Sequence, residues 1–245
     1  MLGLGNSLTQ DYKHIWRDDY SLQFNGTDES VTLPAGLCDN IVLTEGSMLA
    51  WIKVLTTSST GQIIRVEIDS NNFISIYYHA GSNELRTAYK GGGTAVTAAT
   101  TDAIENDGNW HLVVSTWDTT ARQLKLYLDG TLKQTKPNTG GLPTISDSFE
   151  QGSIASTAGS SGFFKGYIND VALYNSVLSS SEITTIYNSG TPIDLMDGNV
   201  FSGITSNILA YYKFEKGSGT TAYDASGAGL NGTLANAPTW STDTP

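Results

Sequence analysis

The sequence predicts an all-β protein, a two-layer antiparallel jelly-roll sandwich with one short helix. The first observation is composition: the chain has 26 glycines and only 15% charged residues, and Thr, Ser, Val, Ile and Tyr are plentiful. This composition is typical of strands joined by tight turns. The second is that short alternating segments recur at regular spacing, as in sandwiches and barrels. The third is that 245 residues with 39% hydrophobic side chains can bury one large core, so one domain is expected.

The first predicted element is a hairpin over residues 20–33. Its apolar residues alternate up to a turn at Asn25–Gly26 and then resume, with Val31 and Leu33 facing inward. Further strand-like segments follow, separated by Ser, Thr, Gly or Asn. In chain order they cover residues 47–55, 61–69, 73–80, 83–90, 110–118 and 122–135.

The segment 122–135 shows why two layers are expected. Leu124, Leu126 and Leu128 alternate with Lys125, Tyr127 and Asp129, so one face of this strand meets a core and the other meets water or another layer. Asp129–Gly130 is the strongest short hairpin signal in the chain. A two-layer jelly roll satisfies this pattern.

Residues 164–190, FKGYINDVALYNSVLSSSEITTIYNSG, change their period part-way through. A strand-like run that ends at Tyr174 gives way, after a serine cluster, to apolar residues at helical spacing. These residues are Leu178, Ile183, Ile186 and Tyr187. The segment therefore predicts a strand followed by one short helix.

Five motifs occur in an order that resembles a known family: YSLQFNGTDESVTLP, SMLAWIKV, DGNWHLVVSTWD, LKLYLDGTL and GYINDVALYNSVLSSSEITTIYN. Residues 20–190 resemble the laminin-G-like branch of the concanavalin A-like lectin/glucanase superfamily. The resemblance implies that the helix follows the last strand, with the serines of LSSSEI capping it and a Glu in its first turn. Its apolar side chains would pack on the sandwich.

The C-terminal segment departs from the order of that family. Residues 208–240 resemble the stretch that normally precedes LQFNG, so the chain looks circularly permuted. We expect an N-terminal arm (1–19), the jelly roll (20–190), a connecting segment (191–207) and C-terminal strands (208–245). These last strands either complete the same sandwich, pair with a neighbouring subunit or form a small separate lobe.

The resemblance also implies a structural calcium ion at the edge of the sandwich. Its oxygen ligands come from the FNGTDE turn and from the acidic residue of GYIND, and the matching positions are Asn25, Asp28 and Asp170. Turn chemistry also explains Asn25–Gly26, and Asp170 could be a cap or a solvated residue.

Catalysis is not expected. The stretch VEIDSNN is close to the E-x-D-x-x-E signature of the retaining glucanases in this superfamily, but Asn72 stands where the second Glu belongs. A retaining mechanism needs two carboxyl groups, and an amide cannot exchange a proton. Glu67 and Asp69 are then ordinary strand residues, and a glycan hydrolase is the third hypothesis for this chain.

Carbohydrate binding rests on aromatic side chains. Tyr77, Tyr78, Tyr89 and Trp117 are the candidates for stacking on a sugar, although Trp117 coincides with a core position of the family. Because Ile74, Ile76 and Tyr78 share one face, Tyr77 and His79 lie on the other and are the preferred ligand-binding residues.

Charge, cysteine usage and the N-terminus limit the cellular role. A net charge of −11 argues against nucleic acid, and Cys38 is the only cysteine, so no internal disulfide is expected. Neither a signal peptide nor a membrane span is recognisable, which indicates a protein made in a cytoplasm.

The leading functional hypothesis is a non-enzymatic structural or accessory protein of a bacteriophage virion, because residues 1–16 resemble openings of small phage structural proteins. It would be a capsid decoration or a tail-fibre adhesin, a homo-oligomer in contact with other virion subunits, and able to hold host glycans. The alternative is a bacterial carbohydrate-binding or adhesion module.

Overall fold

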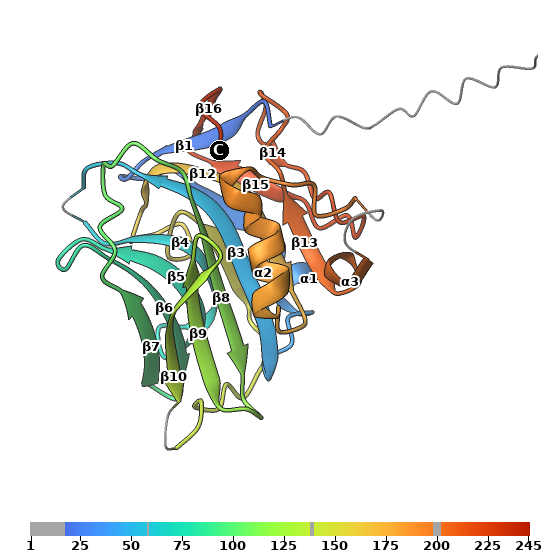
Figure 1. Ribbon diagram of the computed structural model, residues 1–245. Helices are drawn as coiled ribbons and strands as arrows, with labels where there is room; N and C mark the ends of the chain where they lie inside the picture. The colour runs from blue at the N-terminus through green and yellow to red at the C-terminus, as the bar shows by residue number, and fades with distance from the viewer. Residues whose placement is uncertain (1–17, 58, 138–139, 198–201) are drawn as a thin grey trace, which may run out of the picture.

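The computed structural model describes residues 18–57, 59–137, 140–197 and 202–245, so the predicted arm 1–19 lies outside it except for Asp18 and Asp19. Two eight-stranded sheets, here called A and B, form a sandwich (Figure 1), and every pairing between their named strands is antiparallel. The predicted fold class is confirmed.

Sheet A has the order β10-β9-β8-β3-β12-β1-β16, with β13 also paired to β12. Its strands are β1 (Ser21–Asn25), β3 (Glu45–Val54), β8 (His111–Asp118), β9 (Gln123–Leu128), β10 (Thr131–Pro137), β12 (Lys165–Tyr174), β13 (Ile208–Tyr212) and β16 (Thr239–Ser241).

Sheet B has the order β14-β15-β2-β11-β4-β5-β6-β7. Its strands are β2 (Ser30–Leu33), β4 (Gly61–Asp69), β5 (Asn72–His79), β6 (Glu84–Gly91), β7 (Thr94–Thr100), β11 (Gln151–Ile154), β14 (Thr221–Ala222) and β15 (Gly232–Ala235).

Strands from both ends of the chain are interleaved in these sheets. The first half of β12 pairs with β1 and the second half with β13, so β1 and β13 follow one another along the same edge of β12. β16 pairs with β1, and β15 pairs with β2. The segment 208–245 therefore contributes strands to both layers.

A β-bulge interrupts β12 between these two halves. The register against β3 shifts between Asn169 and Ala172, and Asp170 takes a φ of 47°. Such a bulge bends the strand and redirects a side chain. Here it places Asn169 and Asp170 where β13 ends and β1 begins, and both are buried.

The core has two parts. The main cluster fills the space between the sheets and includes Tyr78, Tyr89, Trp117 and the free Cys38. Burial raises the pKa of the Cys38 thiol to about 11. A second cluster covers the outer face of sheet A and includes Trp51.

Helix α2 (Ser180–Tyr187) covers this second cluster, as the sequence predicts (Figure 1). Ser179 is the N-cap and exchanges hydrogen bonds with Glu182 in a capping box, and Asn188 ends the helix in the left-handed conformation. Ile183 is buried, and Tyr187 stacks on Trp51 with ring centroids 5.9 Å apart. Three shorter helical turns, α1 (Ala35–Cys38), η1 (Asn188–Gly190) and α3 (Ser202–Thr205), were not predicted.

Candidate functional site

The outer face of sheet B presents alternate side chains of β4, β5 and β6 away from the core. Tyr78 and Tyr89 belong to the main core cluster, so their neighbours along the strands point outward. We call this surface the outer face of sheet B; its central side chains are Arg65, Glu67, Phe73, Ser75, Tyr77, His79, Glu84, Arg86, Ala88 and Lys90.

Arg65 is the centre of one polar cluster on this face. Its Nε donates to Oε2 of Glu67 at 2.5 Å, and its guanidinium carbon lies 3.6 Å from the centroid of the Phe73 ring. Arg65 is 6% exposed and Glu67 4% exposed, so both are held rigidly. Lys90 approaches the same ring, with Nζ 5.7 Å from its centroid.

Arg86 is the centre of a second cluster, at the hairpin between β5 and β6. Its Nε donates to Oε2 of Glu84 at 2.8 Å, and Ser82 Oγ donates to the same oxygen at 2.9 Å. These hydrogen bonds, that of Arg86 first, lower the pKa of Glu84. His79 Nδ1 lies 2.8 Å from Ser82 Oγ, and Tyr77 is paired in register with Arg86.

Small side chains separate the two clusters. Ser75 pairs in register with Arg65 on one side and with Ala88 on the other, and both small residues are buried. The Ser75 hydroxyl has no hydrogen-bond partner. The face thus combines two guanidinium groups, carboxylates and aromatic rings around a row of small residues, which is suited to hydrogen bonding and stacking.

The sequence-based candidates are placed as follows. Tyr77 and His79 are half-buried on the outer face of sheet B, on the same side as Arg65 and Arg86. Tyr78, Tyr89 and Trp117 lie in the core instead. The period of 2 that places Tyr77 on this face also places Arg65 and Arg86 there, so the alternation is the signal that identifies both arginines.

The glucanase-like stretch does not supply an acid. Glu67 is paired with Arg65, and Asp69 accepts hydrogen bonds from Asn71 N and Asn72 Nδ2. These bonds lower the pKa of Asp69, whereas a general acid needs a raised pKa. The hypothesis that the chain has no hydrolase activity stays a prediction.

The three predicted calcium ligands are not brought together. Asn25 Nδ2 donates to Asp28 Oδ1 at 2.9 Å, and Asn25 Oδ1 accepts from Thr27 N at 2.7 Å, which is turn chemistry. In the register of β1 and β12, Asn25 lies opposite Lys165. At the usual rise of a strand, Asp170 lies roughly 15 Å further along β12.

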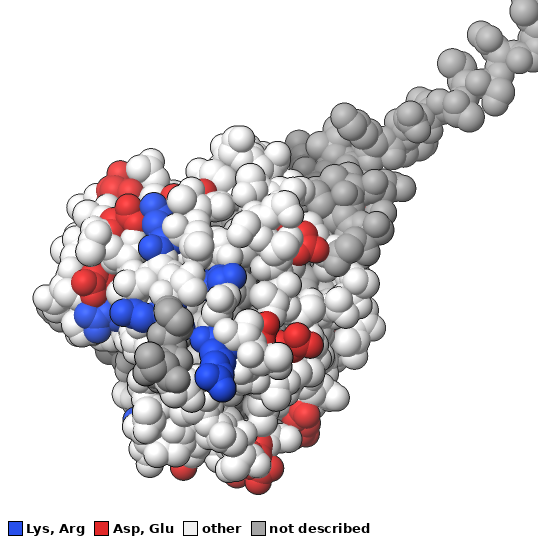
Figure 2. All heavy atoms as spheres, turned by 60° about the horizontal axis from the view of Figure 1, so that its bottom comes forward, with Lys and Arg blue, Asp and Glu red and all other residues white. Residues whose placement is uncertain are grey.

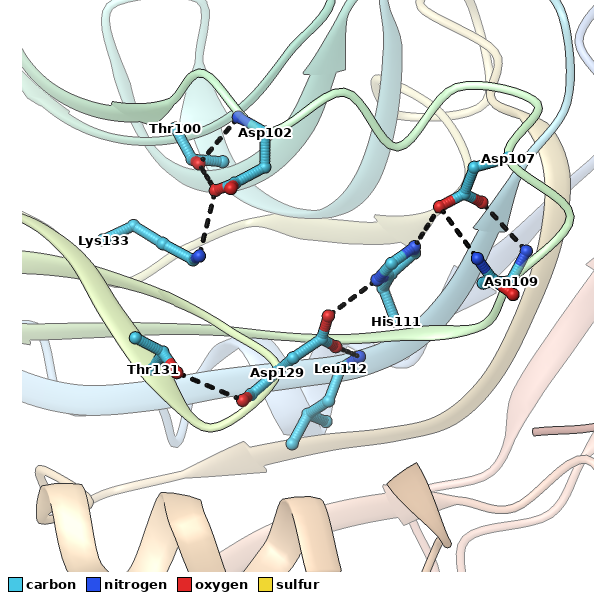
Figure 3. A network of polar contacts seen from close by, with 9 residues as sticks. All are labelled: Thr100, Asp102, Asp107, Asn109, His111, Leu112, Asp129, Thr131 and Lys133. Atoms are coloured by element: carbon cyan, nitrogen blue, oxygen red, sulfur yellow. Dashed lines mark hydrogen bonds and ion pairs between the residues drawn. The ribbon is translucent and has the colours of Figure 1, made fainter. Parts of the chain in front are cut away.

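His111 holds a network at the start of β8 (Figure 3). Its Nδ1 lies 2.7 Å from Asp129 Oδ2 and its Nε2 lies 2.9 Å from Asp107 Oδ2. Asp129 Oδ1 also accepts from Leu112 N, and Asp107 Oδ1 accepts from Asn109 N. Each ring nitrogen of His111 contacts a carboxylate, Asp107 from the loop before β8 and Asp129 from the turn between β9 and β10. The network therefore links this loop to this turn.

A pocket of about 260 Å³ lies beside the C-terminal strands. Trp240, Tyr223 and Phe214 line it together with Lys213 and Lys216. Tyr223 is 54% exposed, and Lys216 Nζ lies 5.8 Å from the centroid of its ring. This pocket is a second place where a ring-shaped ligand could stack.

The charged side chains are unevenly distributed. In Figure 2, which brings forward the bottom of Figure 1, Lys and Arg gather near the middle and left of the view while Asp and Glu lie around them. A chain with a net charge of −11 therefore keeps a locally cationic area.

Within the described ranges, no three or more His, Cys, Asp or Glu side chains form a ready-made metal site. A membrane-spanning candidate is likewise absent from the helices of this part of the chain, since none is long and apolar enough.

A family model described as the concanavalin A-like lectin/glucanases superfamily matches residues 25–184. No match was found among proteins with curated descriptions. Among solved structures, a Bacteroides ovatus protein proposed to bind carbohydrate has a TM-score of 0.67 at 16% identity. That alignment covers 93% of this chain and 61% of the other, so the chain spans less than two thirds of that protein.

Two further structures are similar over about two thirds of the chain. The CBM40 module of the Ruminococcus gnavus IT-sialidase, bound to α2,3-sialyllactose, has a TM-score of 0.56 at 17% identity, covering 68% of this chain and 96% of the module. A heptameric SAP-like pentraxin from Limulus polyphemus has a TM-score of 0.51 at 18% identity, covering 69% and 82%. At these identities the likeness concerns the fold.

Proposed function

This chain belongs to the concanavalin A-like lectin/glucanases superfamily, and on that basis we propose that it is a carbohydrate-binding module whose ligand lies on the outer face of sheet B. The observation that carries the proposal is the arrangement of Tyr77 and Arg86 on adjacent strands of one face, beside the buried pair of Arg65 and Glu67. Sites for small ligands combine apolar and aromatic surface with a few placed polar groups, and this face has both.

The chemistry of the face favours sugars that carry a carboxylate. A guanidinium group binds a carboxylate through two parallel hydrogen bonds. The face has three cationic side chains, Arg65, Arg86 and Lys90, against two anionic ones, Glu67 and Glu84, in a chain that is acidic overall. The ring of Tyr77 supplies apolar surface for a pyranose. The CBM40 module with sialyllactose supports this choice of ligand.

The test is calorimetric titration of the whole chain with 3′-sialyllactose and with lactose. We expect the sialylated sugar to bind and lactose to bind more weakly. Tyr77→Ala and Arg86→Gln should each weaken binding by about tenfold, the effect of losing about 1.4 kcal/mol.

Tyr223→Ala is the matched control, because it also removes a tyrosine ring, but from a residue that lies beside the C-terminal pocket. It should leave the affinity unchanged. Loss of binding in Tyr223→Ala but not in Tyr77→Ala would indicate that the sugar binds in that pocket and not on the outer face of sheet B. Absence of binding to both sugars and to a broad glycan array would refute the proposal.

Membership of a bacteriophage particle stays a prediction from the resemblance of residues 1–16, and so do virion partners and homo-oligomerisation. The carbohydrate-binding proposal does not depend on them. A glycan-binding face would serve an adhesin on a particle and a bacterial module equally well.

A further inference from the structure

The pocket beside the C-terminal strands lies outside the part of the chain that the family model matches. That model covers residues 25–184, whereas the described residues that line the pocket lie between positions 213 and 240. The outer face of sheet B, by contrast, is formed by strands within the matched range. The pocket is therefore separate from the proposed carbohydrate site, and its ligand can belong to another chemical class.

Three aromatic rings form most of the apolar lining of the pocket. Phe214 is 4% exposed, and its ring stacks on that of Tyr212 with centroids 6.4 Å apart. Tyr223 is largely exposed, because its neighbour Ala222 is the residue that enters the core. Trp240, from β16, is half-buried. Such rings bind the flat or apolar surface of a ligand by stacking.

The loop that borders the pocket is held in place by the rest of the protein. Trp240 Nε1 donates to the carbonyl of Gly219 at 3.1 Å. Gly217 has a φ of 67°, and a Cβ atom at this position would lie 2.6 Å from the ring of Tyr20. The loop is thus packed against both β16 and the residue before β1. A site that is already formed loses less conformational entropy when its ligand binds.

The volume of the pocket limits the size of its ligand. The pocket measures about 260 Å³. A cavity of about 150 Å³ accommodates benzene, whereas sites for drug-sized ligands begin at about 300 Å³. The pocket therefore has room for one ring with a short substituent. A trisaccharide such as 3′-sialyllactose is too large for it.

Most polar groups of the lining are already engaged. The indole N–H of Trp240 is bonded to the loop, and Lys213 Nζ pairs with Asp194 at 2.7 Å. Glu215 Oε2 accepts from the backbone N–H of Asp19 at 2.8 Å, and its other carboxylate oxygen is buried. A sugar brings several hydroxyl groups that each need a partner, and few partners remain here. An aromatic ring has no such requirement.

Lys216 is the charged side chain of the lining that is still available. It is exposed, its Nζ lies 5.8 Å from the centroid of the Tyr223 ring, and none of the ion pairs among the described residues involves it. An ammonium group beside an aromatic wall attracts an anionic group on a ligand that stacks there. A carboxylate is a suitable anion.

We propose that this pocket binds a small aromatic acid, which is a single aromatic ring that carries a carboxylate. The ring stacks on Tyr223 and Trp240, and the carboxylate pairs with Lys216. A free aromatic acid and an aromatic residue at the C-terminus of a peptide share this chemistry. The proposal does not rest on the carbohydrate-binding function, because the two sites have no residue in common.

The test is calorimetric titration of the full chain with phenylacetate and with phenylacetamide, a neutral molecule of nearly the same shape. Phenylacetate should bind once per chain, and phenylacetamide should bind about fivefold more weakly, the upper range for an exposed ion pair. Lys216→Gln should weaken the binding of phenylacetate about fivefold and leave phenylacetamide unchanged. Tyr223→Ala should weaken both about tenfold, because both ligands stack on its ring.

Tyr167→Ala is the matched control. It also removes a tyrosine ring with a lysine ammonium 5.8 Å from its centroid, that of Lys53, but Tyr167 lies in β12 and does not line the pocket. Both affinities should stay unchanged in this variant. The tripeptide Gly-Gly-Phe distinguishes the two sources of the ligand, since tighter binding of the tripeptide than of phenylacetate identifies a peptide C-terminus.

The proposal is overturned if neither phenylacetate nor Gly-Gly-Phe binds, if Tyr223→Ala binds phenylacetate as the wild type does, or if Tyr167→Ala loses binding. Equal affinity of the wild type for phenylacetate and phenylacetamide would exclude an acid as the ligand. Tighter binding of galactose than of phenylacetate would exclude the aromatic class. Tyr223 and Lys216 are exposed, so both variants should fold with an unchanged melting temperature. If Tyr223→Ala does not, Lys216→Gln decides.

Discussion

At the scale of single residues, the protonation of His111 makes the stability of the folded protein depend on pH. Its side chain is largely buried, which alone would lower its pKa, but the carboxylates of Asp129 and Asp107 reverse this effect and raise it. The folded protein therefore holds the proton of His111 more tightly than the unfolded chain does. The stabilisation is fully present below the unfolded pKa of about 6.5 and is lost as the pH rises through the folded pKa.

We expect His111→Gln to lower the melting temperature more at about pH 5.5 than at about pH 8.5, because only the protonated imidazole forms two ion pairs. Thermal unfolding of both proteins at the two pH values measures the difference. His79→Gln is the control, since His79 contacts only Ser82 in the described hydrogen bonds. An equal deficit of His111→Gln at both pH values would show that the ion pairs contribute nothing.

Single side chains of the outer face of sheet B could be oriented from the sequence, whereas the contact between Asp18 and Asn169 could not be predicted. The period of 2 in β5 is enough to separate Tyr77 from Tyr78. Asp18 and Glu215, by contrast, meet only because β1 and β13 share β12, and no local pattern carries that information. The bulge at Asp170 has no local signal either, so the sequence groups this strand residue with Asn25 and Asp28, from which it lies apart.

At the scale of elements, α2 depends on its N-terminal cap. Ser179 Oγ accepts from the backbone N–H of Glu182, and the Glu182 carboxylate accepts from Ser179 N at 2.7 Å. The helix has only eight residues, so its stability comes from this cap and from the buried Ile183 and Ile186.

Ser179→Ala should reduce the free energy of unfolding by about 1 kcal/mol, the usual cost of removing a side-chain N-cap. Chemical denaturation followed by tryptophan fluorescence measures this, since Trp51 lies under the helix. Thr185→Ala, at an exposed position of the same helix, should change the free energy by no more than about 0.5 kcal/mol. A loss in Ser179→Ala no larger than in the control would contradict the role of the cap.

Elements with strong local signals could be predicted, and short ones could not. The serine cluster and the helical spacing identify α2, and Asp129–Gly130 identifies the hairpin of β9 and β10. β14 has two residues and β16 has three, so both are too short to show a repeated alternation. Their positions depend on pairing with β15 and β1.

At the scale of the whole molecule, the core requires both ends of the chain. Ala210, Tyr212, Ala222 and Leu234 belong to the main core cluster. β15 and β16 pair with β2 and β1 from the other end of the chain, and β13 pairs with β12. Removing residues 207–245 would expose this apolar surface and leave the edges of β1, β2 and β12 unpaired.

We therefore expect a chain ending at residue 206 to lose cooperative unfolding, as measured by near-ultraviolet circular dichroism during denaturation. A chain ending at Asp243 is the control, because it keeps the bonds from Asp243 to Lys53 and Trp110. Cooperative unfolding of the shorter chain would show that residues 18–206 are an independent domain.

The pairing of β1 with β16 also determines how the protein can be attached to something else. Ser21 lies opposite Ser241, and Ser21 Oγ donates to the carbonyl of Asp243, so the two ends of the described chain meet at one corner (Figure 1). A partner domain or a surface joined next to Ser21 would therefore lie at the same corner of the sandwich as one joined after Asp243. In either case the outer face of sheet B would have the same orientation relative to the point of attachment.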